Sequence, residues 1–314
     1  MKAVITGASG FLGAHLRAAL SEYDVVGLCR SPVADWMQSG DVLDRESLEA
    51  AFAGADLVVH AAGGVAHTSA DAGTMQAVHV GGTTNALEAA KAAGVSRFVH
   101  VSTSGTVAVS ANASFVADED GPDVLPLVSG WPYYRAKLFA EQAAMAFEGL
   151  DVFVINPTLM LGPGDRRGSS TSSVQLFLDG DLPAAPSGGL SFVDVRDVAA
   201  AVPLLLQRGQ PRRRHLLGAV NLTFAAFYER LARVADLPPP RLRLPRATGT
   251  LLGWLPESLR GRVADTFGVD RVELEMASHH WYLDHRRAVT ELGWSPRDPN
   301  ETLLDTVEDL RAHA

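Results

Sequence analysis

Residues 2–13 read KAVITGASGFLG, an apolar, β-branched run that leads into three regularly spaced glycines. The run Lys2–Thr6 is typical of a buried strand, and a helical pattern follows the glycines. Gly7, Gly10 and Gly13 suit the tight turn between the two, because glycine lets the backbone pass where a side chain would block it. The free N–H groups at the start of a helix bind diphosphates. The stretch therefore predicts a dinucleotide-binding turn between a first strand and a first helix.

Strand and helix patterns continue to alternate over the first two-thirds of the chain. Further buried strands are expected at Asp24–Leu28, Leu57–His60, Phe98–Ser102 and Val152–Asn156, and helices at 11–21, 46–53, 74–93 and 133–148. This alternation predicts an α/β fold with a doubly wound parallel sheet of the Rossmann type.

The rhythm loosens after residue 157, where turn-rich pieces replace the regular alternation. We expect residues 1–157 to form the dinucleotide-binding domain, joined by segments that return near 190–220. Residues 158–189 and 221–314 are expected to form a smaller, mostly helical lobe that binds the substrate. A substrate pocket would then lie between the lobes, beyond the carboxyl ends of the strands.

The composition excludes several classes of protein. The chain has 314 residues, a net charge of −9 and 47% hydrophobic residues. The acidic balance argues against a nucleic-acid partner and against a basic membrane-binding surface. The only cysteine, Cys29, excludes an intrachain disulfide and a cysteine-based zinc site, and no metal is expected. No targeting or membrane-spanning segment is predicted, so a reducing cytoplasm is the expected location.

The end of the second predicted strand indicates which dinucleotide is bound. Arg30 lies twenty positions after Gly10, where NAD-binding proteins place an acidic residue that holds the ribose 2′-hydroxyl. A guanidinium at this position suits a 2′-phosphate and can stack on adenine. Arg30 therefore favours NADP as the cofactor, with NAD possible.

A tyrosine and a lysine four residues apart open the predicted helix 133–148. Residues at this spacing share a helix face, so Tyr133 and Lys137 point the same way. A nearby ammonium stabilises a phenolate, which predicts a lowered pKa for Tyr133 and a role as general acid and base. The chain holds only three lysines, which makes a chance coincidence less frequent. The hydroxyl-rich stretch 101–107, which follows a predicted strand, could hold a substrate oxygen beside Tyr133.

Together these motifs resemble those of the extended short-chain dehydrogenase/reductase family, also called the NAD-dependent epimerase/dehydratase family. The resemblance covers nearly the whole chain. The motifs that carry it are TGASGFLG at 6–13, GDV at 40–42, HAAG at 60–63, VSTSGTV at 101–107, YYRAK at 133–137, NPT at 156–158, GP at 162–163, FVDVRDV at 192–198 and ELGW at 291–294. The Asn-Pro-x-x-x-x-Gly-Pro form and Arg30 are similar to the dihydroflavonol reductase-like branch.

The resemblance implies roles for individual residues. Ser104, Tyr133 and Lys137 would form the catalytic triad. The cofactor would contact the glycine turn through Gly7, Ser9, Gly10, Phe11, Leu12 and Gly13, adenine would meet Asp41 and Val42, Ala61, Ala62 and Gly63 would pass under the cofactor, and Asn156, Pro157 and Thr158 would approach the nicotinamide. Asp194 and Asp197 are expected to be structural. One position departs from the pattern, because His79 stands where many relatives carry asparagine.

These residues predict hydride transfer between a nicotinamide and the carbonyl or secondary alcohol of a small, fairly apolar substrate. The expected pocket walls include Val107, Trp131, Tyr134 and Met160. Two alternatives stay open: a nucleotide-sugar epimerase or dehydratase that keeps NAD tightly bound, and a non-catalytic, NADP-binding regulatory protein. The helices 74–93 and 133–148 resemble the pair that forms dimer interfaces in this family, so a homodimer is expected.

Overall fold

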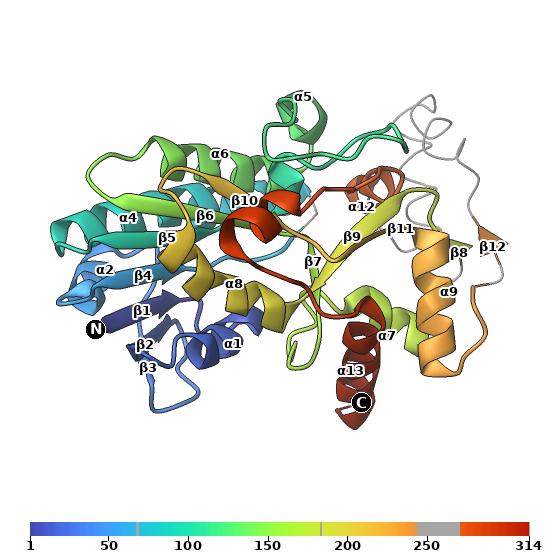
Figure 1. Cartoon of the computed structure of the whole chain (residues 1–314), viewed down its shortest axis with the longest axis horizontal. Coiled ribbons are helices and arrows are strands. Elements are labelled where there is room, and N and C mark those ends of the chain that lie inside the picture. The colour runs from blue at the N-terminus through green and yellow to red at the C-terminus, as the bar shows by residue number, and fades with distance from the viewer. Residues whose placement is uncertain (67–68, 183, 241, 244–270, 314) are drawn as a thin grey trace.

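The computed structural model describes residues 1–66, 69–182, 184–240, 242–243 and 271–313. Its main element is a seven-stranded parallel sheet in the order β3-β2-β1-β4-β5-β6-β10 (Figure 1). The strands are β1 Lys2–Thr6, β2 Asp24–Cys29, β3 Met37–Ser39, β4 Leu57–His60, β5 Arg97–Val101, β6 Asp151–Pro157 and β10 Arg214–Leu217. The predicted Rossmann-type α/β fold is confirmed.

Helices cover both faces of this sheet, because the buried side chains of each strand alternate between two apolar cores. On one face lie α1 (Phe11–Ala19) and α8 (Val195–Arg208), which pack on strand residues such as Ile5 and Val59. On the other face lie α2 (Arg45–Phe52), α4 (Gly82–Ala92) and α6 (Pro132–Ala146). Both faces of the central strands are therefore dry, as the continuous apolar runs of the sequence indicate.

The predicted helix 74–93 is not one regular helix. It consists of α3 (Ala72–Met75), a π-helical stretch (Gln76–Gly81) and α4. The wider π turn contains His79, which is buried with 3% of its surface exposed. Such π turns are rare and often occur at functional sites.

The glycine turn needs glycine for steric reasons. Gly7 has a φ of +73°, and a Cβ atom there would lie 2.7 Å from the carbonyl oxygen of Ala61. A Cβ atom on Gly13 would lie 2.3 Å from the carbonyl oxygen of Ala8. Both obstacles are backbone atoms, so the turn and the following helix hold this close approach only with glycine at both positions.

A smaller lobe is built around a second, three-stranded sheet in the order β11-β9-β7. The strands are β7 Leu159–Leu161, β9 Gly189–Asp194 and β11 Val220–Thr223, and the helices are α7 Ser172–Leu178, α9 Phe224–Ala235 and α13 Pro299–Ala312. Helix α12 (Arg271–Met276) packs instead in a cluster with Trp131 and Leu138. Short elements complete the described chain: η1 Ser69–Asp71, η3 Ser104–Thr106, α5 Leu125–Val128, η4 Ala288–Leu292, and the strand pair β8 Ala184–Ala185 with β12 Leu242–Arg243. Of the segment near 190–220, α8 and β10 pack with the large sheet, whereas β9 belongs to the small one.

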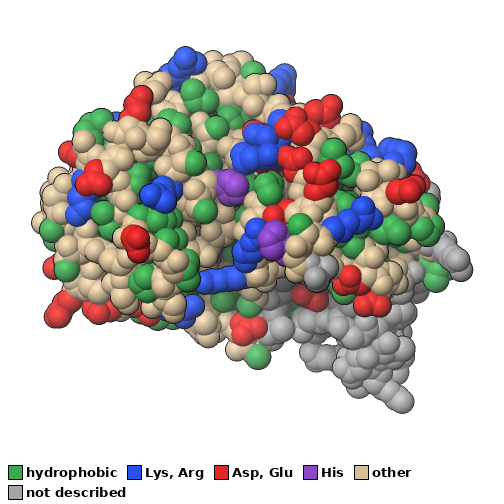
Figure 2. Space-filling view, turned by 90° about the horizontal axis from the view of Figure 1, so that it is seen from below, with side chains coloured by type: hydrophobic (Ala, Val, Ile, Leu, Met, Phe, Trp, Pro, Cys, Tyr) green, Lys and Arg blue, Asp and Glu red, His purple; other side chains and the backbone are tan. Residues whose placement is uncertain are grey.

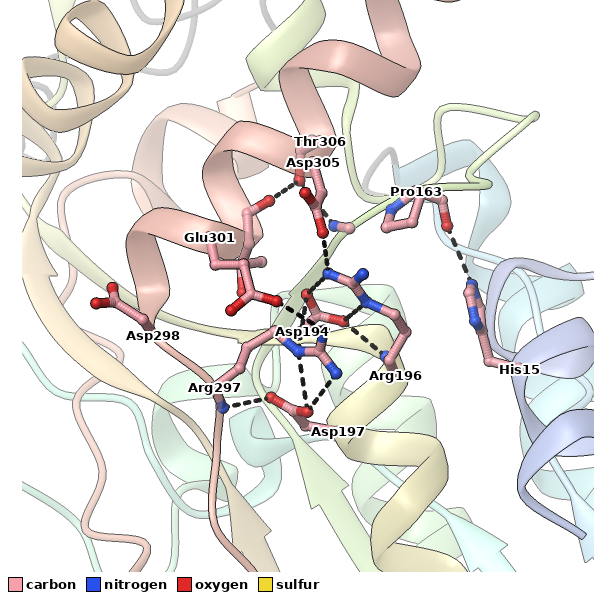
Figure 3. Close-up of polar contacts among 12 residues, drawn as sticks. His15, Pro163, Asp194, Arg196, Asp197, Arg297, Asp298, Glu301, Asp305 and Thr306 are labelled. Atoms are coloured by element: carbon pink, nitrogen blue, oxygen red, sulfur yellow. Dashed lines mark hydrogen bonds and ion pairs between the residues drawn. The ribbon is translucent and has the colours of Figure 1, made fainter.

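Ion pairs fasten the end of β9 to the C-terminal helix α13 and the segment before it (Figure 3). Asp194 accepts a hydrogen bond from the backbone N–H of Arg196 at 2.8 Å and caps α8. The Arg196 guanidinium bridges Asp194 and Asp305 of α13, and Arg297 donates to both carboxylate oxygens of Asp197. The structural roles expected for Asp194 and Asp197 are confirmed.

One face of the molecule is mixed in charge. On the face shown in Figure 2, basic and acidic side chains alternate with hydrophobic ones and form no extended patch of one sign. None of the helices in the described ranges combines the length and the apolar character needed to cross a membrane.

Candidate active site

The predicted cofactor residues gather at one edge of the large sheet, because the carboxyl ends of parallel strands all face the same way. The glycine turn follows β1, Arg30 follows β2, and Asp41 and Val42 come shortly after β3. Ala61, Ala62 and Gly63 follow β4, Ser104 follows β5, and Thr158 follows β6. Ligands of such open sheets bind in this position.

The start of α1 fits a diphosphate. The helix begins after Gly10, which has no side chain to cap the first free N–H groups. Residues at the ends of β1 and β4 support the turn, since Thr6 Oγ1 accepts from the Ala62 N–H at 3.3 Å and lies 2.9 Å from His60 Nδ1. Uncapped N–H groups and the positive end of the helix dipole are the features that bind phosphate oxygens.

The adenine side of the predicted site is open. Arg30 is exposed at the end of β2. The Val42 backbone is fixed by a 3.0 Å hydrogen bond from Asn85 Nδ2 to its carbonyl oxygen, and the Val42 side chain lies against Gly82 of α4. The contacts of Arg30, Asp41 and Val42 with a nucleotide stay predictions.

One hydroxyl of the stretch 101–107 stands apart from the others. Ser102 and Thr106 donate to the carboxylate of Glu141, and Thr103 Oγ1 accepts from the Gly105 N–H. The hydroxyl of Ser104 hydrogen-bonds to no residue in the described ranges. By this comparison, Ser104 is the member of the stretch whose hydroxyl can serve a substrate.

Helix α6 places Tyr133 and Lys137 next to this stretch. Pro132 occupies the first turn of the helix, and α6 packs against both the Ser104–Thr106 turn and the π turn. Lys137 is 6% exposed, and its Nζ donates a 2.6 Å hydrogen bond to the carbonyl oxygen of Val101. The ring of Tyr133 meets the ring of His79 edge to face, with 5.4 Å between their centroids. Tyr133, Lys137 and the Ser104 turn are thus brought together.

The electrostatics of this pair differ from the expectation. Burial raises the pKa of Tyr133 to about 12, where the lysine was expected to lower it. Burial also lowers the pKa of Lys137 to about 8, and the negative charge of Glu141 partly opposes this. Desolvation outweighs the attraction expected between the two groups, because both lie in a low-dielectric layer. Tyr133 therefore keeps its proton at neutral pH, as a general acid must.

A buried carboxylate that the sequence analysis did not single out connects several residues of the site by hydrogen bonds. Glu141 is fully buried on α6, one turn after Lys137. It accepts hydrogen bonds from Ser102, from Thr106 at 2.8 Å and from Asn156 Nδ2 at 2.6 Å, and its other oxygen lies 2.9 Å from the Arg214 guanidinium. The i, i+4 spacing of Lys137 and Glu141 was the available signal for this residue.

The side chain of Asn156 belongs to this network. It is fully buried, and besides Glu141 it donates to the carbonyl oxygen of Thr103 at 3.1 Å. Its amide thus holds the hydroxyl-rich stretch 101–107 in place. Contacts of residues 156–158 with a nicotinamide stay predictions, and for Asn156 they would have to come from the backbone.

The four expected pocket residues lie in different surroundings. Trp131 and Tyr134 are neighbours, with ring centroids 6.2 Å apart, and Trp281 packs on Tyr134 at 4.7 Å. Val107 and Trp131 are only 2% and 1% exposed, so their side chains support the site from within the core. Met160 packs against the core beneath α1 and α8. Their contacts with a substrate stay predictions.

Three buried histidines lie in the elements around Tyr133 and Lys137: His60 in β4, His79 in the π turn and His100 in β5. His60 and His100 stack with centroids 5.9 Å apart on β4 and β5, and neither ring nitrogen of His100 has a hydrogen-bond partner among the residues that the structure describes. His79 Nε2 lies 2.8 Å from the carbonyl oxygen of Gly64. Burial lowers the pKa of His60 and of His79 to about 3, and the charge of Lys137 adds to the effect. No group of His, Cys, Asp or Glu in the described part of the chain could hold a metal ion.

We expect these histidines to make the protein acid-labile. Their pKa values in the folded chain lie below the unfolded value near 6.5, so the unfolded chain takes up protons first. The free energy of unfolding should be highest above pH 6.5. It should fall by about 1.4 kcal/mol per pH unit for each histidine as the pH drops toward 5.

Urea unfolding at pH 7, 6 and 5 measures this dependence of the free energy of unfolding on pH. His79→Asn should flatten the slope by one proton. Equal slopes in the wild type and His79→Asn would contradict the assignment.

Several known proteins are similar to this chain in sequence or in fold. A model of the NAD dependent epimerase/dehydratase family matches residues 3–218. A putative dihydroflavonol 4-reductase of Synechocystis sp. is 29% identical over 328 residues, covering 98% of this chain and 94% of that protein. Cinnamoyl-CoA reductase 1 of Oryza sativa subsp. japonica is 32% identical over 245 residues, covering 68% and 69%. The crystal structure of gox2253 has a TM-score of 0.85 at 27% identity and covers 100% of this chain and 98% of its own.

Proposed function

Because the chain belongs to the NAD-dependent epimerase/dehydratase family, we propose that it is a reductase or dehydrogenase that uses Tyr133 as general acid and base. It is an NAD(P)-dependent oxidoreductase of the extended short-chain dehydrogenase/reductase type. The observation that carries the proposal is the first turn of α6, which carries Tyr133 and the buried Lys137 and packs against the turn that contains Ser104.

Each residue has a distinct task in carbonyl reduction. The nicotinamide supplies the hydride when it is bound. Ser104 donates a hydrogen bond to the substrate oxygen, and Tyr133 transfers its proton to that oxygen as the alcohol forms. Lys137, fixed by Val101, stabilises the phenolate that remains. The protein thus aligns the reactants and supplies one proton, while the hard chemistry belongs to the cofactor.

The substrate side of Tyr133 favours a fairly apolar carbonyl compound. Tyr134 and Trp281, backed by the buried Trp131, form a continuous aromatic cluster beside it, and Tyr134 lies so close to Gly105 that a Cβ atom there would come within 2.2 Å of the ring. Aromatic side chains bind flat apolar groups by stacking and by exclusion of water. The names of the two relatives, which refer to a dihydroflavonol and a cinnamoyl thioester, describe aromatic substrates and point the same way.

A substrate panel tests the proposal. The purified protein would be mixed with NADPH or NADH and with aldehydes, ketones and sugar nucleotides, and the oxidation of the reduced nicotinamide followed by absorbance. We expect turnover with apolar aldehydes or ketones. Release of a tightly held nucleotide on denaturation, with conversion of sugar nucleotides only, would establish the epimerase instead. Nucleotide binding without turnover on the whole panel would indicate a regulatory protein.

We propose NADP as the preferred cofactor, on the basis of the exposed guanidinium of Arg30 at the end of β2. Arg30→Ala should weaken NADPH binding about tenfold, because one charge-assisted contact to the 2′-phosphate is lost, and should leave NADH binding nearly unchanged. Fluorescence titration of both nucleotides measures this. Arg45→Ala removes another exposed arginine, which is paired with Glu49 and Glu88, and is the matched control. Equal weakening of NADPH and NADH would overturn the assignment.

A further inference from the structure

The loop that follows β7 reaches from the small lobe across to the glycine turn. His15 of α1 places its Nε2 3.0 Å from the carbonyl oxygen of Pro163, and Figure 3 shows the two side by side. Four residues later, the guanidinium of Arg167 donates a 3.2 Å hydrogen bond to the hydroxyl of Ser9. Ser9 lies within the glycine turn, two residues before α1 begins. A cation from one lobe is therefore held beside the uncapped start of a helix in the other.

The loop is fixed in this position by the C-terminal helix. The N–H of Gly162 donates to Thr306 Oγ1 at 2.8 Å, and the N–H of Gly164 donates to Asp309 at 2.9 Å. The buried carboxylate of Asp165 accepts from the N–H groups of Ser170 and Thr171. These hydrogen bonds restrain the backbone of the loop on both sides of Arg167.

The two neighbouring arginines of the loop differ in their charge partners. Arg166 forms an ion pair with Asp309 of α13 at 3.3 Å. Arg167 forms no ion pair with any carboxylate in the described ranges, although it has the same charge and is likewise exposed. A guanidinium that is kept near N–H donors without a carboxylate partner is suited to an anion from outside the chain.

We propose that Arg167 binds the diphosphate of the nicotinamide dinucleotide and so supplies, from the substrate-binding lobe, the cation that the glycine turn lacks. The inference rests on the NAD(P) chemistry of the family. Its guanidinium would donate to a phosphate oxygen in place of the Ser9 hydroxyl or in addition to it, since Ser9 belongs to the turn that leads into α1. The role differs from that of Arg30, because a diphosphate is common to NADP and NAD whereas the 2′-phosphate is not.

Binding measurements without turnover test the proposal. Arg167→Ala should weaken NADPH, NADH and ADP-ribose by the same factor, about tenfold, as expected for one charge-assisted contact. The preference for NADPH over NADH should not change. Arg167→Lys should recover part of the affinity, and Arg166→Ala should bind all three like the wild type. Isothermal titration calorimetry gives the affinities, and thermal unfolding of the ligand-free variants shows whether the fold is intact.

Two outcomes would overturn the inference. In the first, Arg167→Ala binds NADPH, NADH and ADP-ribose as tightly as the wild type. In the second, Arg167→Ala loses affinity for NADPH alone. Equal losses in Arg166→Ala and Arg167→Ala would show that the loop acts only as a strut between the lobes. If the wild type binds none of the three ligands, the proposed function itself fails, which separates the two conclusions.

Discussion

Tyr133→Phe should lower turnover about a thousandfold and leave the affinity for NADPH unchanged. A positioned general acid contributes roughly a hundred- to ten-thousandfold to such reactions, and phenylalanine removes the only proton that the tyrosine can give. The ring contact with His79 and the place on α6 are kept, so the fold should be unaffected. Steady-state rates on a substrate found in the panel, with NADPH affinity from fluorescence titration, measure both parts.

Tyr134→Phe is the matched comparison for this result. Tyr134 adjoins Tyr133 on the same helix, and its ring packs on Gly105 and Trp281. Loss of its hydroxyl leaves that packing in place and should retain most of the turnover. A similar collapse in both variants, or full activity in Tyr133→Phe, would remove Tyr133 from its proposed role.

Lys137→Arg should be far more damaging than the same exchange at Lys91, with a loss of at least about a hundredfold in kcat/KM. The Lys137 ammonium fits a buried site 2.6 Å from the Val101 carbonyl oxygen, and a bulkier, forked guanidinium cannot occupy it without moving the backbone. The ammonium of Lys91 is exposed and donates to the carbonyl oxygen of Glu148 at the surface. Steady-state rates of Lys137→Arg and Lys91→Arg measure this difference, and thermal unfolding checks that both variants are folded. Equal activity of the two variants would count against the proposed mechanism.

The pH dependence gives a second readout for Lys137. Because burial lowers its pKa to about 8, the wild-type kcat/KM for carbonyl reduction should fall as the pH rises through 8 and the ammonium loses its proton. Residual activity of Lys137→Arg should not fall in this range, since arginine keeps its charge.

Local patterns in the sequence predicted the fold, which is confirmed, and the candidate catalytic residues, which stay predictions. The glycine spacing, the alternation of strands and helices, and the pair Tyr133 and Lys137 are each determined within a few residues of chain. The raised pKa of Tyr133 could not be found in this way, because it depends on how completely the site excludes water. The contacts of Glu141 and of Arg167 were equally hidden, because their partners lie between 15 and 158 residues away along the chain. The π turn around His79 also escaped, since helical periodicity does not register one extra residue.

Glu141 has a consequence for how this enzyme could change. One carboxylate ties together the serine-containing stretch, β6, β10 and the helix that carries the reacting tyrosine, and all of these ties lie within the large-sheet lobe. The contacts that hold the proposed catalytic residues are therefore independent of the small lobe. We expect exchanges in the loops of the small lobe to leave these contacts unchanged. A substitution of Arg214 on the edge strand β10 should in contrast disturb the proposed catalytic residues through Glu141, although Arg214 itself is not among them.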